Sequence, residues 1–211
     1  MTSRRRFLSA ALAGGVGVMA CLSSPALAQT PADLLNEVSR RLDSPAVLRG
    51  EFDQTKTLKG FKRPLLSHGS FVMARDRGIQ WITNEPFAST LVVTRERLLT
   101  VSDGVSQQVD TRQEPGLRAV NDMLMALLAG DVKALAGRFQ SEGVLSGTQG
   151  WRLSLIPREA GLARFIARIE LEGDRHVTHV RLHEASGDDS SIRFSRQNTT
   201  ALSPAEVARF N

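Results

Sequence analysis

The sequence predicts an α+β fold that is mainly β, in which helices cover one curved antiparallel sheet of about nine to eleven strands. Three observations predict this fold. Residues 50–94 and residues 139–194 alternate apolar and polar side chains with the period of two that half-buried strands have. Residues 117–129, which lie between these regions, have the spacing of an amphipathic helix. Because a sheet of this size curls, its apolar side becomes concave, and the helix can cover it as a lid.

The first residues have the composition of an export signal. Arg4, Arg5 and Arg6 precede an apolar segment at residues 8–19, as in a twin-arginine signal peptide. That segment is too short for a permanent transmembrane helix, and Ala26-Leu-Ala28 is an A-x-A cleavage site. We therefore expect residues 1–28 to be a signal peptide of the twin-arginine type and residues 29–211 to form one exported domain.

An alternative interpretation of the N-terminus starts from Cys21. The sequence Val18-Met19-Ala20-Cys21 loosely fits a lipobox, which would make Cys21 the lipidated first residue of a membrane-anchored protein. Cys21 is the only cysteine, so no disulfide can form within the chain. If cleavage follows Ala28 instead, no thiol remains for redox chemistry.

Charge and length narrow the function further. Removal of residues 1–28 takes away three of the 27 basic residues and none of the 22 acidic ones, which leaves a net charge of about +2. This near balance, together with export, argues against nucleic acid as a partner. No linker or repeat divides the remaining chain, which is long enough for one sizeable core. No glycine-rich phosphate-binding loop or other cofactor motif is present, and we expect no cofactor.

Residues 30–42 have the pattern of a first helix. Thr30 is suited to cap it and Pro31 to occupy its first position, where the missing N–H costs nothing. Arg40 and Arg41 fall on the side that we expect to face water. The apolar residues form one stripe that can pack across the sheet: Leu34, Leu35, Val38 and Leu42.

The first group of strands extends from Gly50 to Thr94. A long polar loop separates its first two strands, and a tight turn at Asp76 to Gly78 connects the second and third. Asp103-Gly104 is a strong hairpin signal and predicts two more strands. The apolar residues at alternate positions of this group are predicted to line the concave surface: Phe71, Met73, Ile79, Trp81, Leu91 and Val93.

The predicted lid helix is unusually apolar and rich in methionine. Methionine adapts to irregular apolar shapes, so the helix suits a lid over a variable apolar ligand, but it suits an ordinary core helix equally well. Asp131 is expected to cap a further short helix through Leu135. The apolar side of the lid helix carries Leu117, Val120, Met123, Leu124, Leu127 and Leu128, with Met125 beside them.

A second antiparallel group of strands follows from Phe139. Ser203-Pro204-Ala205-Glu206 then has capping-box spacing and predicts a closing turn of helix through Phe210. The predicted apolar sides of the last four strands are Trp151, Leu153 and Leu155; Phe165, Ala167, Ile169 and Leu171; Val180 and Leu182; and Ile192 and Phe194.

Four features of residues 50–94 occur together in a fixed order. They are Phe52-x-Gln54, Gly69-x-Phe71, Arg75 six residues before Trp81, and Pro86 ahead of an aliphatic strand. In this order and spacing they resemble the LolA family, the periplasmic carriers that move lipoproteins between membranes in Gram-negative bacteria. The chain departs from the family pattern at Asp76, since the family usually has proline directly after the arginine.

The resemblance implies an incomplete barrel covered by helices, which encloses an apolar cavity for acyl chains. The concave-face residues named above, together with Met123, Leu124, Leu127 and Leu128, would line this cavity. In the family, the arginine that matches Arg75 bonds to the backbone of the lid and holds the empty cavity closed. Arg75 would therefore act as a gate that opens when cargo binds.

The resemblance also implies a periplasmic protein that is not an enzyme and acts as a monomer. Its partners would be lipoproteins or other acylated cargo, an inner-membrane releasing transporter and an outer-membrane receptor. If Cys21 is lipidated, the alternative is a membrane-anchored lipoprotein receptor or envelope-assembly module.

Metal and hydrolase sites are the remaining alternatives. Strand spacing places His179 and His183 on one face and His176 on the other, without an HExxH or CxxC motif, so we expect no metal site. The sequence Gly143-Val-Leu-Ser146-Gly147 is similar to a G-x-S-x-G motif, but the position of its serine differs from the motif by one residue. Activity that is lost when His179 or Ser146 is mutated would support a hydrolase.

Overall fold

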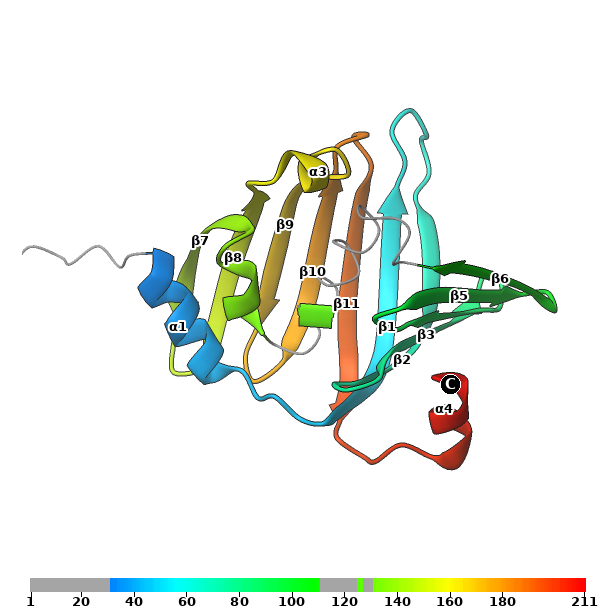
Figure 1. The fold of residues 1–211 in the computed structure, drawn as a ribbon. Helices are drawn as coiled ribbons and strands as arrows, with labels where there is room; N and C mark the ends of the chain where they lie inside the picture. The colour runs from blue at the N-terminus through cyan, green and yellow to red at the C-terminus, as the bar shows by residue number, and fades with distance from the viewer. Residues whose placement is uncertain (1–30, 111–124, 127–130) are drawn as a thin grey trace, which may run out of the picture.

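The computed structural model describes residues 31–110, 125–126 and 131–211. Its strands form one antiparallel sheet of eleven in the order β6-β5-β4-β3-β2-β1-β11-β10-β9-β8-β7 (Figure 1). The first group comprises β1 (Val47–Thr57), β2 (Leu65–Ala74), β3 (Gly78–Glu85), β4 (Ser89–Val93), β5 (Arg97–Ser102) and β6 (Val105–Asp110). The second comprises β7 (Phe139–Ser146), β8 (Gly150–Pro157), β9 (Ile166–Gly173), β10 (Val177–Glu184) and β11 (Asp189–Asn198).

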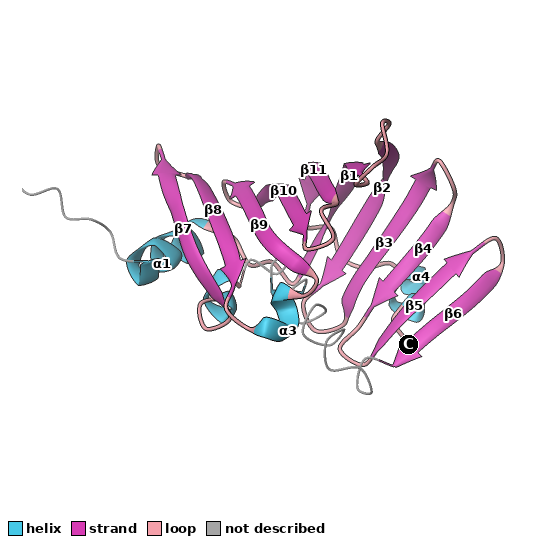
Figure 2. Ribbon diagram, turned by 90° about the horizontal axis from the view of Figure 1, so that it is seen from above, coloured by secondary structure: helices cyan, strands magenta, loops and turns pink. Residues whose placement is uncertain are grey.

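The sheet is curved but not closed. Figure 2 shows the strands following one another along a curved wall, with β6 and β7 at its two edges. The two groups of strands meet where β1 pairs with β11, and Phe52 lies opposite Phe194 in this pairing. The prediction of a mainly β protein built on one curved antiparallel sheet is therefore confirmed.

Turn chemistry explains the hairpin between β5 and β6. Asp103 and Gly104 both have positive φ angles, 51° and 76°. This backbone matches the right-handed twist of the flanking strands, and aspartate and glycine adopt it most easily. The predicted Asp-Gly hairpin is confirmed.

Two helical segments, one N-terminal and one in the middle of the sequence, lie on the concave face of the second group of strands. They are α1 (Pro31–Arg41), which contacts β7, and the 3-10 helix η2 (Val132–Leu135), which contacts α1 (Figure 1). The predicted stripe of α1 is buried, with Val38 fully so. Arg41 differs from the prediction, because its guanidinium is mostly buried and donates from Nη1 to the Gly150 carbonyl over 2.6 Å.

The closing helix α4 (Pro204–Arg209) lies on the opposite, convex face of the first group of strands. Phe210, which ends it, packs on Ala74 and Val92, whose neighbours in the strands face the other way. The predicted capping box is confirmed, with the Ser203 hydroxyl accepting from the Glu206 N–H and the Glu206 carboxylate accepting from the Ser203 N–H.

At the start of β9, the buried and exposed side chains are the reverse of those predicted. Phe165 is 54% exposed, whereas Ile166 is buried, because the register with β10 shifts between His183 and Glu184. Such a bulge moves the following side chains to the other face. A short helix, α3 (Ala160–Ala163), precedes this strand. No helix among the described residues is long and apolar enough to cross a membrane.

Candidate functional site

The concave face of the first group of strands is built around two pairs of glycine and phenylalanine. Gly69 lies opposite Phe52, and Gly50 lies opposite Phe71, in the pairing of β1 with β2. A Cβ atom at Gly69 would lie 2.8 Å from Cε1 of Phe52, and one at Gly50 would lie 2.9 Å from Cε1 of Phe71. The two glycines leave room for the rings and for the neighbouring backbone, since the same Cβ atoms would lie 2.0 Å from the Ile82 carbonyl oxygen and 2.7 Å from the Ser195 carbonyl oxygen.

An aromatic cluster follows from this arrangement. The rings of Phe52 and Trp81 stack with centroids 3.8 Å apart, and Phe194 meets Phe71 edge to face at 5.1 Å. Phe194 also meets Trp81 edge to face at 6.0 Å. Phe52 and Phe71 are completely or almost completely buried, whereas Trp81 keeps part of its surface exposed. The cluster is therefore a packed apolar floor, and part of Trp81 is exposed at its edge.

The six strand residues predicted to line the concave surface come together in one apolar cluster. Phe71, Met73, Ile79 and Val93 are buried, and Trp81 and Leu91 are partly buried against them. Met125 and Ala126 are helical and pack against the same cluster. Met123, Leu124, Leu127 and Leu128 lie outside the described residues.

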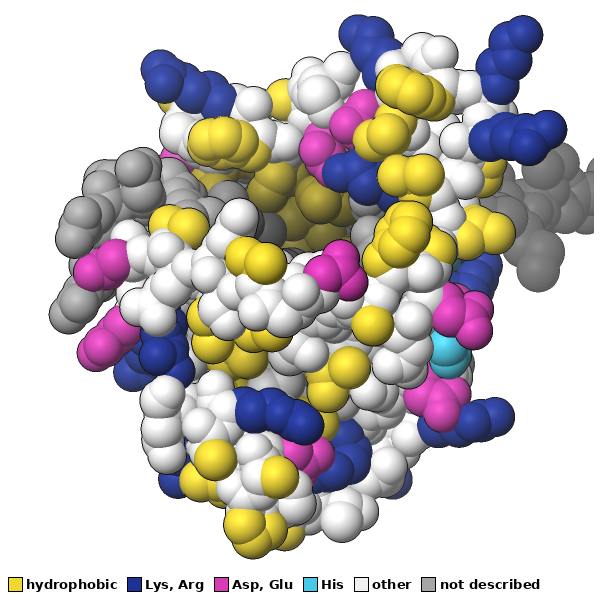
Figure 3. All heavy atoms as spheres, turned by 90° about the vertical axis from the view of Figure 1, so that its right-hand side faces the viewer, with side chains coloured by type: hydrophobic (Ala, Val, Ile, Leu, Met, Phe, Trp, Pro, Cys, Tyr) yellow, Lys and Arg dark blue, Asp and Glu magenta, His cyan; other side chains and the backbone are white. Residues whose placement is uncertain are grey.

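Further apolar residues of the same face were not predicted as site residues. Leu98, Val180, Leu182 and Ile192 are partly buried against the cluster, together with the fully buried Phe52. Strand periodicity places each of them on an apolar face, but only the pairing of β1 with β11 shows that the two groups share this face. Figure 3 shows the molecule hollowed on this side, with hydrophobic side chains deep in the hollow.

Arg75 lies in the turn between β2 and β3 and is exposed. Its Nη2 donates to the Ser44 hydroxyl over 2.8 Å, and its backbone N–H donates to the Ala46 carbonyl. The guanidinium thus fastens the turn to the segment that leads from α1 into β1. The lid helix to which the family resemblance ties Arg75 lies mostly outside the described residues, so its role as a gate stays a prediction.

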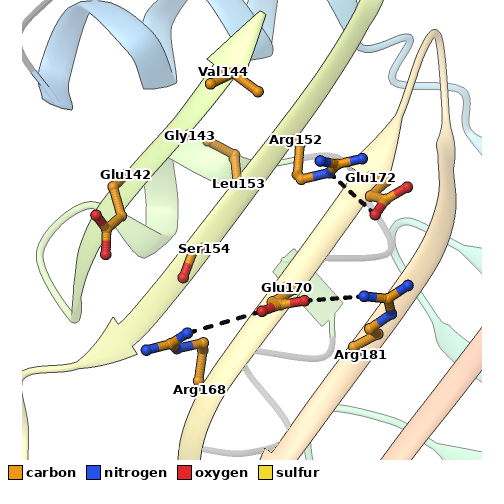
Figure 4. Close-up of a pocket in the computed structure, with 10 residues that line it drawn as sticks. All are labelled: Glu142, Gly143, Val144, Arg152, Leu153, Ser154, Arg168, Glu170, Glu172 and Arg181. Atoms are coloured by element: carbon orange, nitrogen blue, oxygen red, sulfur yellow. Dashed lines mark hydrogen bonds and ion pairs between the residues drawn. The ribbon is translucent and has the colours of Figure 1, made fainter.

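The convex face of the second group of strands is polar. Arginine and glutamate side chains alternate there around a shallow pocket of about 680 Å³ (Figure 4). Arg152 and Glu172 pair at 3.1 Å, and Glu170 lies 3.5 Å from Arg181 and 4.0 Å from Arg168. Exposed pairs of this kind contribute little free energy. They give this face a balanced, hydrated surface without an apolar site.

His179 is the buried polar residue of that convex face. Its Nε2 lies 2.9 Å from the Ser191 hydroxyl, but the Glu172 carboxylate is 4.0 Å from Nδ1, too far for a hydrogen bond. Burial, followed by the charges of Arg193 and Arg181, lowers the pKa of His179. Without an orienting carboxylate or a strained nucleophile turn, these residues do not form a catalytic triad. Ser146, at the end of β7, is not part of this cluster.

Metal binding has no support in the same region. His183 pairs with Asp189, while His179 faces Ser191. Within residues 31–110, 125–126 and 131–211, no group of three or more histidine, cysteine, aspartate or glutamate residues could hold a metal ion.

Comparison with known families decides the relationship. The family described as "Outer membrane lipoprotein carrier protein LolA" matches residues 43–210. The chain belongs to the LolA family. The matched region of this LolA family member contains all eleven strands and α4, but begins after α1.

Solved structures are similar to this LolA family member at low sequence identity. A DUF1329 family protein from Desulfovibrio piger has a TM-score of 0.50 at 11% identity, over 83% of this chain and 94% of that one. A LolA superfamily protein from Nitrosomonas europaea has a TM-score of 0.46 at 11% identity, over 84% and 97%. MucB in the Pseudomonas aeruginosa MucA/MucB complex has a TM-score of 0.46 at 17% identity, over 86% and 60%. No curated protein matches the chain.

Proposed function

We propose that this protein is a periplasmic carrier that binds the acyl chains of lipoproteins, or of a related lipid, and transfers them toward the outer membrane. The observation that carries the proposal is the apolar concave face of β1 to β4 and β11, where Trp81 and Leu91 remain partly exposed beside the buried Phe52 and Phe71. The description of the LolA family supports the same function.

Burial of the acyl chain supplies the binding free energy. Each methylene group that leaves water contributes roughly 0.8 kcal/mol, so even partial cover of a chain holds it without covalent chemistry. Transfer then needs only an acceptor with a better apolar surface. Residues 117–129 act in this proposal as the lid, and the packing of Met125 and Ala126 against the apolar cluster supports this role.

Lipid binding is tested first on the purified protein. Mass spectrometry of co-purified lipids and displacement of a fluorescent fatty acid would measure the occupancy of the apolar face. Leu91→Glu places a charge on this face, and we expect it to weaken binding at least tenfold, because a buried carboxylate must be desolvated or protonated.

The matched control for that variant is Thr55→Glu, which adds the same charge at an exposed position of β1 on the convex face. It should bind the fatty acid as the wild type does. Protein that is always free of lipid, and that fails to extract a lipoprotein from membranes, would contradict the carrier function.

The gate is tested by Arg75→Leu. In the proposed carrier Arg75 stabilises the closed, empty state, so the variant should bind acylated cargo but release it to acceptor membranes several-fold more slowly. Its melting temperature should stay close to that of the wild type, since Arg75 is exposed and its described side-chain contact is with Ser44. Unchanged transfer at unchanged stability would contradict the gate and leave the apolar site untouched.

The alternative of an anchored receptor is decided by the N-terminus. Intact-mass measurement of the exported protein should give a chain that begins at Gln29. A diacylated Cys21 would instead support the receptor or envelope-assembly module.

A further inference from the structure

The loop between β1 and β2 exposes an uninterrupted run of eight residues. Every residue from Lys59 to Leu66 is exposed, and the apolar ones are among the most exposed large hydrophobic residues described. Phe61 is 69% exposed, Leu66 64% and Leu65 57%. A compact apolar patch of this kind is uncommon on a protein that meets only water, and it marks a contact surface.

The base of this loop is fixed, although its tip is exposed. The backbone N–H of Lys59 donates to the Asp188 carboxylate over 2.8 Å, and Lys56 pairs with Glu184 at 2.7 Å. The Phe61 N–H donates to the Leu58 carbonyl and closes a turn. Figure 1 shows the loop projecting beyond the neighbouring strands. The loop is therefore held out from the sheet rather than folded back on it.

Two further phenylalanines lie at the same end of the sheet. Glu85 pairs with His68, so Phe87, two residues beyond the pairing, lies beside the end of β2 that carries Leu66. Phe87 is 77% exposed. Phe165 precedes β9 at the end where β10 leads into β11, and it is 54% exposed. The exposed aromatic residues thus gather at one edge of the molecule.

The charge of the loop has a single sign. Residues 54–66 contain no acidic residue, but they contain Lys56, Lys59, Lys62 and Arg63. Among the ion pairs between described residues, none involves Lys62 or Arg63. The turn at the opposite end of the sheet, Arg75-Asp76-Arg77, contains both signs. Positive charge beside exposed apolar side chains is therefore a property of this loop.

We propose that the β1–β2 loop docks the protein on a membrane surface that contains anionic phospholipid. Phe61, Leu65 and Leu66 would enter the boundary between headgroups and acyl chains, and Lys59, Lys62 and Arg63 would lie at the phosphate groups. Lysine and arginine suit this position because their apolar stems follow the hydrocarbon while their charged ends stay in water. A single short loop gives weak, reversible binding, which suits a protein that leaves the membrane again.

The docking surface adds to the proposed carrier function without resting on it. The loop binds the membrane through its own side chains, whereas cargo binding uses the concave face. The two functions are therefore measured separately, and either can fail alone.

Sedimentation with vesicles tests the proposal. The processed protein, its N-terminus verified by intact mass, is mixed with vesicles of phosphatidylcholine alone or of phosphatidylcholine with phosphatidylglycerol. We expect binding to the anionic vesicles that falls with added salt, because counterions screen the phosphate groups. Phe61→Ser with Lys62→Gln should weaken this binding at least tenfold, since each cation alone accounts for about fivefold.

The matched control is Val144→Ser with Arg77→Gln. It removes an equally exposed apolar residue and one exposed cation far from the loop, and it should bind vesicles as the wild type does. Phe61→Trp reports insertion directly, because its fluorescence should shift to shorter wavelength on anionic vesicles and be quenched by brominated acyl chains.

Absence of vesicle binding would overturn the proposal, and so would equal losses in the loop variant and the control. Displacement of the fluorescent fatty acid by each variant identifies which function failed. A loop variant that has lost vesicle binding but still binds the fatty acid supports docking as a separate property of the loop.

Discussion

The helices α1 and η2 lie on one face of the sheet in its second half, and α4 lies on the opposite face in its first half. In β7 to β9, α1 and η2 cover the concave face, where Leu153, Leu155 and Leu171 are completely buried. In β2 to β5, α4 lies on the convex face, Met125 and Ala126 pack against the concave face, and Trp81 and Leu91 stay partly exposed there. The same strand pattern therefore serves a completely buried core in one half and, in the other half, an apolar face that stays partly exposed at Trp81 and Leu91.

This difference supports the choice of the first half for the proposed ligand site. A completely buried apolar face stabilises the fold, but it has no accessible surface to which a ligand could bind. On the concave face of the first half, Trp81 stacks on Phe52 but keeps part of its own surface exposed.

Truncation of a leucine in each half is expected to have the largest effect. Leu153→Ala removes a completely buried side chain beneath α1 and η2, and it should lower the free energy of unfolding by about 3 kcal/mol. Leu91→Ala, on the partly open face, should cost about 1.5 kcal/mol or less. Urea unfolding measures both. Equal losses would show that the two concave faces are packed alike.

The cover by α4 is tested by Glu206→Gln. Burial raises the pKa of Glu206, but hydrogen bonds from Arg49 and Ser203 outweigh this and leave the pKa lowered from 4.5. A lowered carboxyl pKa stabilises the fold at neutral pH, and this stability is lost as the pH falls below about 4.5. The variant should lose roughly 1 kcal/mol at pH 7.

Measurement of stability against pH is the check on this prediction. The difference between the wild type and Glu206→Gln should disappear in acid, where the wild-type carboxyl is protonated. A difference that stays constant down to strongly acidic pH would mean that the charge of Glu206 does not hold α4 in place.

The smallest effect is expected from His179, on the convex face of the second half. The pKa of His179 is lowered from 6.5 in the folded protein. As the pH falls through 6.5, His179 is therefore protonated in the unfolded chain before it is protonated in the folded protein. Stability should therefore decrease below pH 6.5, and His179→Gln should remove this part of the slope. Thermal melting between pH 5 and pH 7.5 would reveal it. An identical slope in both proteins would contradict the assignment.

Local patterns were sufficient for much of the fold. Trp151, Leu153 and Leu155 alternate with polar neighbours, and their burial follows directly from the period of a half-exposed strand. The capping box at Ser203 and the turn at Asp103-Gly104 are equally local, since each depends on residues within one turn of the chain. The LolA resemblance in residues 50–94 rests on such short spacings too.

Other features depend on pairing between distant segments. The register shift that exposes Phe165 results from the pairing of β9 with β10. The proximity of His179 to Ser191 results from the pairing of β10 with β11. The spacing within α4 indicates an apolar side but does not specify which face of the sheet receives it. The shared concave face of the site has the same origin, because Phe194 joins Phe71 and Trp81 only through the pairing of β11 with β1.

Among the described residues, the strand order ends at β6 and β7 without closing into a barrel, and this has a mechanical consequence. In a closed barrel the number of strands and their stagger set the circumference, and a change of girth requires broken backbone hydrogen bonds. A curved sheet that is not closed can instead widen or narrow by a small change of twist at each strand pair, with every ladder intact. In the proposed carrier, acyl chains that differ in number and length would then be held by the same set of backbone bonds.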